Sequence, residues 1–153
     1  MDTNTFVYTT YIAVPPEKVW EALTNGEFTK QFWYGREVKS DWKVGSEAIY
    51  TMPDGNVNIV SKIRKIDPPK FLEFTFQDVS TASLKGDPES IVTYELEEVK
   101  ANMKTGAKAT SGTKFTVTHY AKSENLFNAV KNGWTMILSG LKTLLETGKP
   151  MQI

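Results

Sequence analysis

Apolar and polar residues alternate along six segments of the chain, and this alternation predicts β-strands. Leu72, Phe74 and Phe76, for example, alternate with polar residues, so one face of that segment is apolar. Short turns separate most of the segments, among them Pro53–Asn56, whose Asp-Gly pair suits a tight hairpin. Such connections imply antiparallel pairing. The expected strands are Phe6–Val14, Gly35–Met52, Val57–Ile66, Phe71–Gln77, Ser90–Glu98 and Thr113–Tyr120.

Three other segments have the spacing of helices. Pro16 can begin the first, because proline in the first helical position costs no hydrogen bond. Thr24 and Glu27 have the form of a capping box, which predicts a second, short helix. Ser123 can cap the third, whose apolar residues keep a 3.6-residue period as far as Gly148. This last helix is about 24 residues, or ~36 Å, long, enough to cross a small sheet.

Two connections lack any periodicity. Asp78–Glu89 is expected to be a surface loop, and Val99–Gly112 a long, flexible hairpin loop. The whole order is one strand, two short helices, five strands and one long helix. It predicts a single α+β domain over residues 1–153, in which a curved antiparallel six-stranded sheet wraps around a long C-terminal helix.

The composition narrows the possible functions. Lys and Arg number 18, as do Asp and Glu, so no net charge attracts nucleic acid or anionic lipid. The chain has no cysteine and one histidine, His119, so we expect no metal site and no cofactor. No stretch is apolar enough to cross a membrane. The first basic residue is Lys18, so a secretory signal is not expected and the protein is predicted to be cytoplasmic.

Several segments, in this order, resemble the START-like or SRPBCC superfamily, also called the helix-grip fold. More narrowly, they resemble the branch homologous to the activator of heat-shock protein 90 ATPase. The resemblance covers nearly the whole chain. The segments that carry it are Pro15–Thr24, Ile66–Lys70, Gly112–His119, Gly133–Leu141 and Leu145–Gly148.

The resemblance implies a cavity between the sheet and the C-terminal helix, which in such proteins typically binds lipids, sterols or polyketides. We therefore expect non-catalytic binding of a small hydrophobic molecule, lipid-like or aromatic. Two alternatives stay open. One is an enzyme similar to polyketide cyclases or aromatases; the other is a co-chaperone that activates a heat-shock ATPase, for which a protein partner is possible but has no support in the sequence.

Glycines inside the last helix are the first local clue to such a site. Gly133 and Gly140 should each cost about 1 kcal/mol relative to alanine. With Ala129 and Met136 they form a narrow strip of small side-chain volume beside the leucine stripe. The strip either roofs a cavity or admits the backbone of a strand at close range.

Aromatic and polar residues supply the other candidates. Phe32, Trp33 and Tyr34 are consecutive and cannot all face the core, so some of them are expected at a cavity mouth, near Trp42. His119 is either a core histidine whose hydrogen bonds are satisfied or a hydrogen-bond partner for the ligand. Tyr50 and Tyr94 could offer the ligand a similar bond.

The candidate ligand-binding residues share an expected place at the interface of sheet and helix; no catalytic residue and no metal ligand is predicted. They are Trp33, Tyr34, Trp42, Tyr50, Phe74, Phe76, Tyr94, Phe115, His119, Ala129, Gly133, Trp134, Met136, Ile137 and Gly140.

Overall fold

A computed structural model describes residues 4–101 and 110–152 of the chain. Its strands are β1 (Thr5–Ile12), β2 (Glu37–Ser40), β3 (Glu47–Thr51), β4 (Val57–Asp67), β5 (Phe71–Asp78), β6 (Ser90–Ala101) and β7 (Thr110–Tyr120). The helices are α1 (Pro16–Thr24), α2 (Gly26–Phe32) and α3 (Glu124–Thr147).

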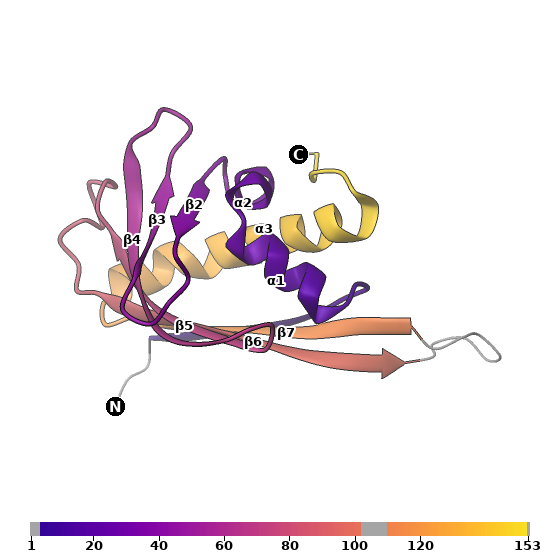
Figure 1. Cartoon of the computed structure of the whole chain (residues 1–153). Coiled ribbons are helices and arrows are strands. Elements are labelled where there is room, and N and C mark those ends of the chain that lie inside the picture. The colour runs from indigo at the N-terminus through magenta and orange to yellow at the C-terminus, as the bar shows by residue number, and fades with distance from the viewer. Residues whose placement is uncertain (1–3, 102–109, 153) are drawn as a thin grey trace.

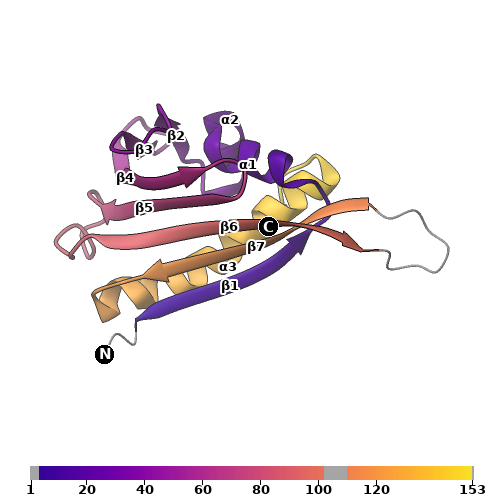
Figure 2. The same cartoon turned by 60° about the horizontal axis from the view of Figure 1, so that its bottom comes forward.

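The strands form one antiparallel sheet in the order β1-β7-β6-β5-β4-β3-β2. In Figure 1, β2, β3 and β4 rise at one end of α3, while β5, β6 and β7 run along its length. Figure 2 shows the outer side of the sheet, with α3 behind it. The predicted α+β architecture of a curved sheet around a C-terminal helix is therefore confirmed.

The prediction of six strands is wrong, because the stretch from Gly35 to Met52 forms two strands. Between β2 and β3 the chain turns at Trp42 (φ 54°) and Gly45 (φ 89°). The Ser46 N–H donates to the Lys43 carbonyl at 2.9 Å and closes this turn. A tryptophan in the left-handed region is uncommon, so alternation alone could not indicate the break.

The capping residues predicted for the helices are observed at both ends of α3 but not at the start of α2. Ser123 caps α3, its Oγ accepting from the Leu126 N–H at 2.9 Å, and Gly148 (φ 78°) ends the helix in the left-handed conformation. The capping box predicted for α2 is absent. Asn25 is the N-cap, because its Oδ1 accepts from the Glu27 N–H at 2.9 Å, whereas the Thr24 hydroxyl donates back to the Trp20 carbonyl within α1.

The two long connections differ in how well they were predicted. Asp78–Glu89 does join β5 to β6 outside the sheet. The predicted loop Val99–Gly112 is too long, because β6 and β7 pair as far as Ala101 and Thr110, with Val99 opposite Gly112. The rest of that predicted loop lies outside the described residues.

Aromatic side chains fill the space between sheet and α3. Trp33, after α2, lies between Tyr50 of β3 and Trp134 of α3, with ring centroids 4.7 and 5.2 Å away. Tyr94 of β6 meets Phe115 of β7 edge-on at 5.4 Å. These side chains are buried, so most of the interior of the fold is packed.

Candidate functional site

A cavity of about 180 Å³ lies beside the N-terminal half of α3. The β5–β6 connection, the start of β4 and the turn after α2 form its other walls. Its lining is mainly apolar, with polar groups contributed by the strands and the connection. The lining residues are Trp33, Tyr34, Arg36, Asn58, Ile59, Phe76, Asp78, Thr81, Leu84, Leu126, Ala129, Val130, Gly133, Trp134 and Ile137.

A tight turn brings three residues to this wall. The Arg36 N–H donates to the Trp33 carbonyl at 3.0 Å, and the two residues between them, Tyr34 (φ 51°) and Gly35 (φ 78°), are both left-handed. Positive φ at both central residues is characteristic of a type I′ turn. Trp33 is buried while Tyr34 remains exposed, so the turn places one ring inside the cavity wall and one at its rim.

Gly133 is a lining residue of the cavity and faces open space. A Cβ atom added at Gly133 would meet no atom within 4 Å beyond its own neighbours. The next residue, Trp134, is 2% exposed, so a buried aromatic ring lies beside the open position.

Gly140, by contrast, is in close contact. An added Cβ there would lie 3.3 Å from the Phe32 carbonyl oxygen and 3.4 Å from the Phe32 Cβ. The backbone that approaches belongs to the end of α2, not to a strand as the close-packing alternative assumed. The small-residue strip therefore combines an open position and a close contact.

His119 lies behind the cavity wall in a buried chain of hydrogen bonds. Trp134 Nε1–H donates to His119 Nδ1 at 2.9 Å. The proton of the neutral ring is then on Nε2, which donates to Ser90 Oγ at 2.7 Å, and Ser90 Oγ donates to the Phe76 carbonyl at 3.2 Å. Burial lowers the pKa of His119 to about 4, so the ring is neutral at physiological pH. Both ring nitrogens are occupied, as expected for a core histidine.

A polar corner closes the other side of the cavity. Arg36 Nε donates to Asn58 Oδ1 at 2.6 Å, and Asn58 Nδ2 donates to Ser80 Oγ at 2.6 Å. Asp78 accepts from the backbone N–H groups of Ser80 and Thr81 and from the Thr81 hydroxyl, at 2.7 to 3.0 Å. The start of the β5–β6 connection is thereby fixed beside β4.

Arg36 is the cation of this corner. Burial lowers its pKa, and the charges of Asp78 and Tyr34 oppose that effect. An arginine nevertheless stays protonated in proteins, so the cavity wall carries a positive charge that water only partly solvates.

The structure places about half of the predicted site residues on the cavity wall: Trp33, Tyr34, Phe76, Ala129, Gly133, Trp134 and Ile137. It does not bring the others there. Tyr50, Phe74, Tyr94, Phe115 and His119 are buried in the packed core. Trp42 packs against the edge of that core, and Met136 and Gly140 line a separate hollow with Met151.

Four polar residues of the cavity wall were not predicted from the sequence: Arg36, Asn58, Asp78 and Thr81. Two signals were present. Asn58 is a polar residue within an otherwise apolar strand start, and Asp78 followed by Ser80 and Thr81 has the spacing of an Asx turn.

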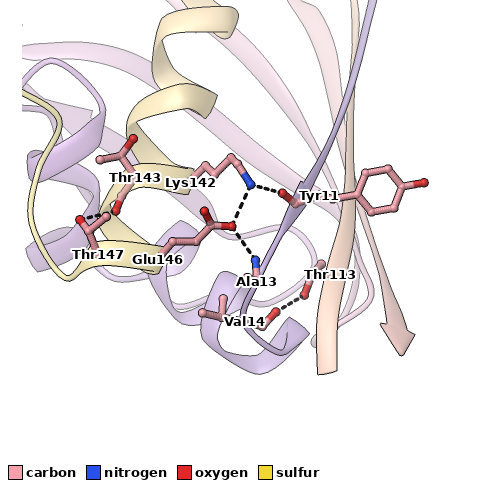
Figure 3. A network of polar contacts seen from close by, with 8 residues as sticks. All are labelled: Tyr11, Ala13, Val14, Thr113, Lys142, Thr143, Glu146 and Thr147. Atoms are coloured by element: carbon pink, nitrogen blue, oxygen red, sulfur yellow. Dashed lines mark hydrogen bonds and ion pairs between the residues drawn. The ribbon is translucent and has the colours of Figure 1, made fainter. Parts of the chain in front are cut away.

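A second polar cluster lies at the other end of α3 (Figure 3). Lys142 Nζ donates to the Tyr11 carbonyl and, at 2.8 Å, to Glu146. Glu146 also accepts from the Ala13 N–H at 2.7 Å. Burial alone would raise the pKa of Glu146, but the hydrogen bonds from Lys142 and Ala13 and the Lys142 charge outweigh it and lower that pKa. These bonds fix the helix end to the end of β1.

Within residues 4–101 and 110–152, no helix is both long and apolar enough to cross a membrane. Nor do three or more His, Asp or Glu side chains gather in a way that could hold a metal ion.

Solved structures share this fold. CalU16 from Micromonospora echinospora is 22% identical with a TM-score of 0.70, over 94% of this chain and 77% of its own. PFC0360w, an HSP90 activator from Plasmodium falciparum, is 24% identical with a TM-score of 0.70, over 97% of this chain and 99% of its own. The Aha1 dimer from Colwellia psychrerythraea is 21% identical with a TM-score of 0.65, over 95% of this chain and 98% of its own. At these identities the likeness shows the fold alone.

The family is established by sequence. No curated protein matches the chain. The sequence model of Activator of Hsp90 ATPase homolog 1-like protein, however, matches residues 13–146, which include all three helices almost to the end of α3. The resemblance seen in the sequence segments is thus confirmed, and the chain belongs to the Activator of Hsp90 ATPase homolog 1-like family.

Proposed function

We propose that this protein binds a small, largely apolar molecule in the cavity beside Gly133, without converting it. The observation that carries the proposal is the empty space at Gly133. Alanine would fit there without a clash and would stabilise the helix by about 0.5 to 1 kcal/mol, so packing does not account for the glycine. We infer that the glycine is present because it leaves space for a ligand.

The volume limits the size of that molecule. An engineered apolar cavity of about 150 Å³ accommodates benzene, whereas sites for drug-sized ligands occupy roughly 300 to 1,000 Å³. At about 180 Å³ the cavity suits one aromatic ring or a short acyl chain. A sterol or an extended polyketide is larger than this volume.

The arrangement gives less support to the two alternatives. A cyclase needs an acid or base in reach of its substrate. His119 has both ring nitrogens in hydrogen bonds, and Asp78 accepts three hydrogen bonds from its own loop. For a co-chaperone, the support is the family name, the description of the Plasmodium protein as an HSP90 activator, and three exposed, largely apolar side chains. These are Val7, Tyr11 and Tyr120, on the outer face of β1 and β7.

Toluene, a single apolar ring, tests the proposal. A titration followed by amide and indole NMR signals should shift the Trp33 and Trp134 indoles saturably, with a dissociation constant on the order of micromolar to millimolar. Gly133→Leu fills the cavity and should weaken toluene binding at least about tenfold while the protein stays folded. Asn132→Leu is the matched control, because it adds the same side chain at the neighbouring exposed position and should bind toluene as the wild type does.

Two results would overturn the proposal. One is a wild-type protein whose indole signals do not respond to toluene. The other is a folded Gly133→Leu variant that binds toluene as tightly as the Asn132→Leu control.

A further inference from the structure

Arg36 has hydrogen-bonding capacity that the protein does not use. Its guanidinium carries five N–H donors, and only Nε–H, which donates to Asn58, has a partner in the described part of the chain. The four N–H bonds on its two terminal nitrogens have none there. Arg36 is also the one cation among the described residues that line the cavity.

Asp78 does not occupy this donor set. No carboxylate of the described residues lies within ion-pair distance of Arg36, although the Asp78 charge is felt there. The Asp78 oxygens instead receive hydrogen bonds from the Ser80 and Thr81 N–H groups and from the Thr81 hydroxyl. Asp78 thus organises the loop and leaves the Arg36 terminal nitrogens available.

The guanidinium is also held in place before any ligand arrives. Asn58 fixes its Nε edge at 2.6 Å, and the Tyr34 ring lies beneath the guanidinium carbon, 5.7 Å from the ring centroid. Asn58 is itself anchored on Ser80. A guanidinium fixed in this way loses little conformational entropy when it binds a planar anion. Because the guanidinium is partly buried, an anionic partner also stabilises its charge.

We propose that the ligand is a small carboxylate, with its ring or acyl chain beside Gly133 and its carboxylate on the terminal nitrogens of Arg36. This inference rests on the proposed function, because it names the chemistry of the molecule that the same cavity takes. The apolar wall supplies affinity for the body of the ligand, and Arg36 selects its charged end.

Benzoate and toluene separate the two contributions, since they share the ring and differ in the carboxylate. In the full-length protein, NMR titration should show benzoate binding at least about tenfold more tightly than toluene, as expected for a charge-assisted pair. Arg36→Met should weaken benzoate binding at least about tenfold and leave toluene binding unchanged. Unchanged toluene binding also demonstrates that this variant is folded.

The chain offers a matched control, because Arg36 and Arg64 are its two arginines. Arg64 pairs with Glu73 at 3.2 Å and does not line the cavity. Arg64→Met changes the net charge equally and should leave the binding of both probes as in the wild type. If Arg36→Met does not fold, Arg36→Lys serves in its place, since it keeps the charge and loses the fork; it should lose part of the preference for benzoate.

The outcomes distinguish this inference from the proposed function. Toluene binding with no preference for benzoate, or a benzoate preference that Arg36→Met and Arg36→Lys both leave intact, overturns the assignment of Arg36 and leaves the cavity proposal standing. A wild-type protein that binds neither probe overturns both.

Discussion

The two halves of α3 differ in how they meet the rest of the molecule. Gly133, in the first half, faces open space, whereas Gly140, in the second, lies against the backbone of Phe32. Both glycines weaken the helix by similar amounts in isolation. A glycine in a helix therefore has no single meaning: Gly133 leaves open space beside α3, and Gly140 lets α2 approach.

The polar contacts of the two halves differ as well. The first half is joined to the sheet by the buried, neutral chain from Trp134 through His119 to Ser90. The second half is joined to β1 by the partly exposed, charged cluster of Lys142 and Glu146. The neutral chain weakens when His119 is protonated, and the charged cluster weakens when Glu146 is protonated. The two sets of hydrogen bonds should therefore be lost over different ranges of pH.

The largest expected effect is the loss of stability in mild acid through His119. Its pKa is about 4 in the folded protein and near 6.5 when unfolded, so between these values the unfolded chain binds more protons. The contribution of neutral His119 to the free energy of unfolding is therefore fully present above about pH 6.5 and is lost as the pH falls toward 4. The total loss is about 3 kcal/mol, measurable by urea denaturation at a series of pH values.

His119→Gln is the variant for this measurement, because an amide can keep one hydrogen bond but does not titrate. It should be less stable at pH 7 and nearly insensitive to pH between 6.5 and 5. A variant that loses stability over that range as steeply as the wild type would show that other groups cause the acid sensitivity.

The second expected effect separates the two glycines directly. Gly140→Leu must displace the end of α2 and should destabilise the protein by about 1 to 3 kcal/mol, seen as a melting temperature several degrees lower. Gly133→Ala meets no atom and should stabilise it by about 0.5 to 1 kcal/mol. If both substitutions change the melting temperature in the same direction, the contrast between the two halves is wrong.

The sequence predicted local features of α3 well because each depends on neighbouring residues. Ser123 as cap and Gly148 as stop follow from the hydrogen bonds and dihedral angles available to those residues. The strip that contains Gly133 and Gly140 was also visible, since it depends only on the period of the helix. What surrounds each glycine depends on segments that are distant in the sequence, and helical periodicity does not carry that information.

The same reason explains the incomplete site. Apolar wall residues such as Trp134 and Phe76 were found because alternation and helical period place them on the inner faces. Arg36 comes from a turn, Asn58 from the start of β4 and Asp78 from the end of β5, and at such positions the pattern of apolar and polar residues does not indicate where a side chain points. They meet only because the left-handed turn at Tyr34 and the hydrogen bonds of Asp78 bring these segments together.

The smallest expected effect concerns the hydrogen bonds of Lys142 and Glu146 to the end of β1, here called the clamp. The pKa of Glu146 is lowered in the folded protein, so its contribution is present above the ordinary carboxylate pKa of about 4.5 and is lost as the pH falls through the folded value. Glu146→Gln removes the charge that Lys142 and Ala13 hold, and at pH 7 it should cost about 0.5 to 1.5 kcal/mol, because the group is partly solvated.

Urea denaturation of wild type and Glu146→Gln should therefore differ at pH 7 and converge near pH 3. Glu21→Gln is the control: Glu21 is exposed on α1 and makes no hydrogen bond or ion pair among the described residues, so its loss should change stability little. Toluene binding at pH 7 should be the same in Glu146→Gln as in the wild type, because the clamp lies at the far end of α3 from Gly133. A Glu146→Gln variant with weakened toluene binding would contradict the independence of the two halves, since the clamp would then also shape the cavity.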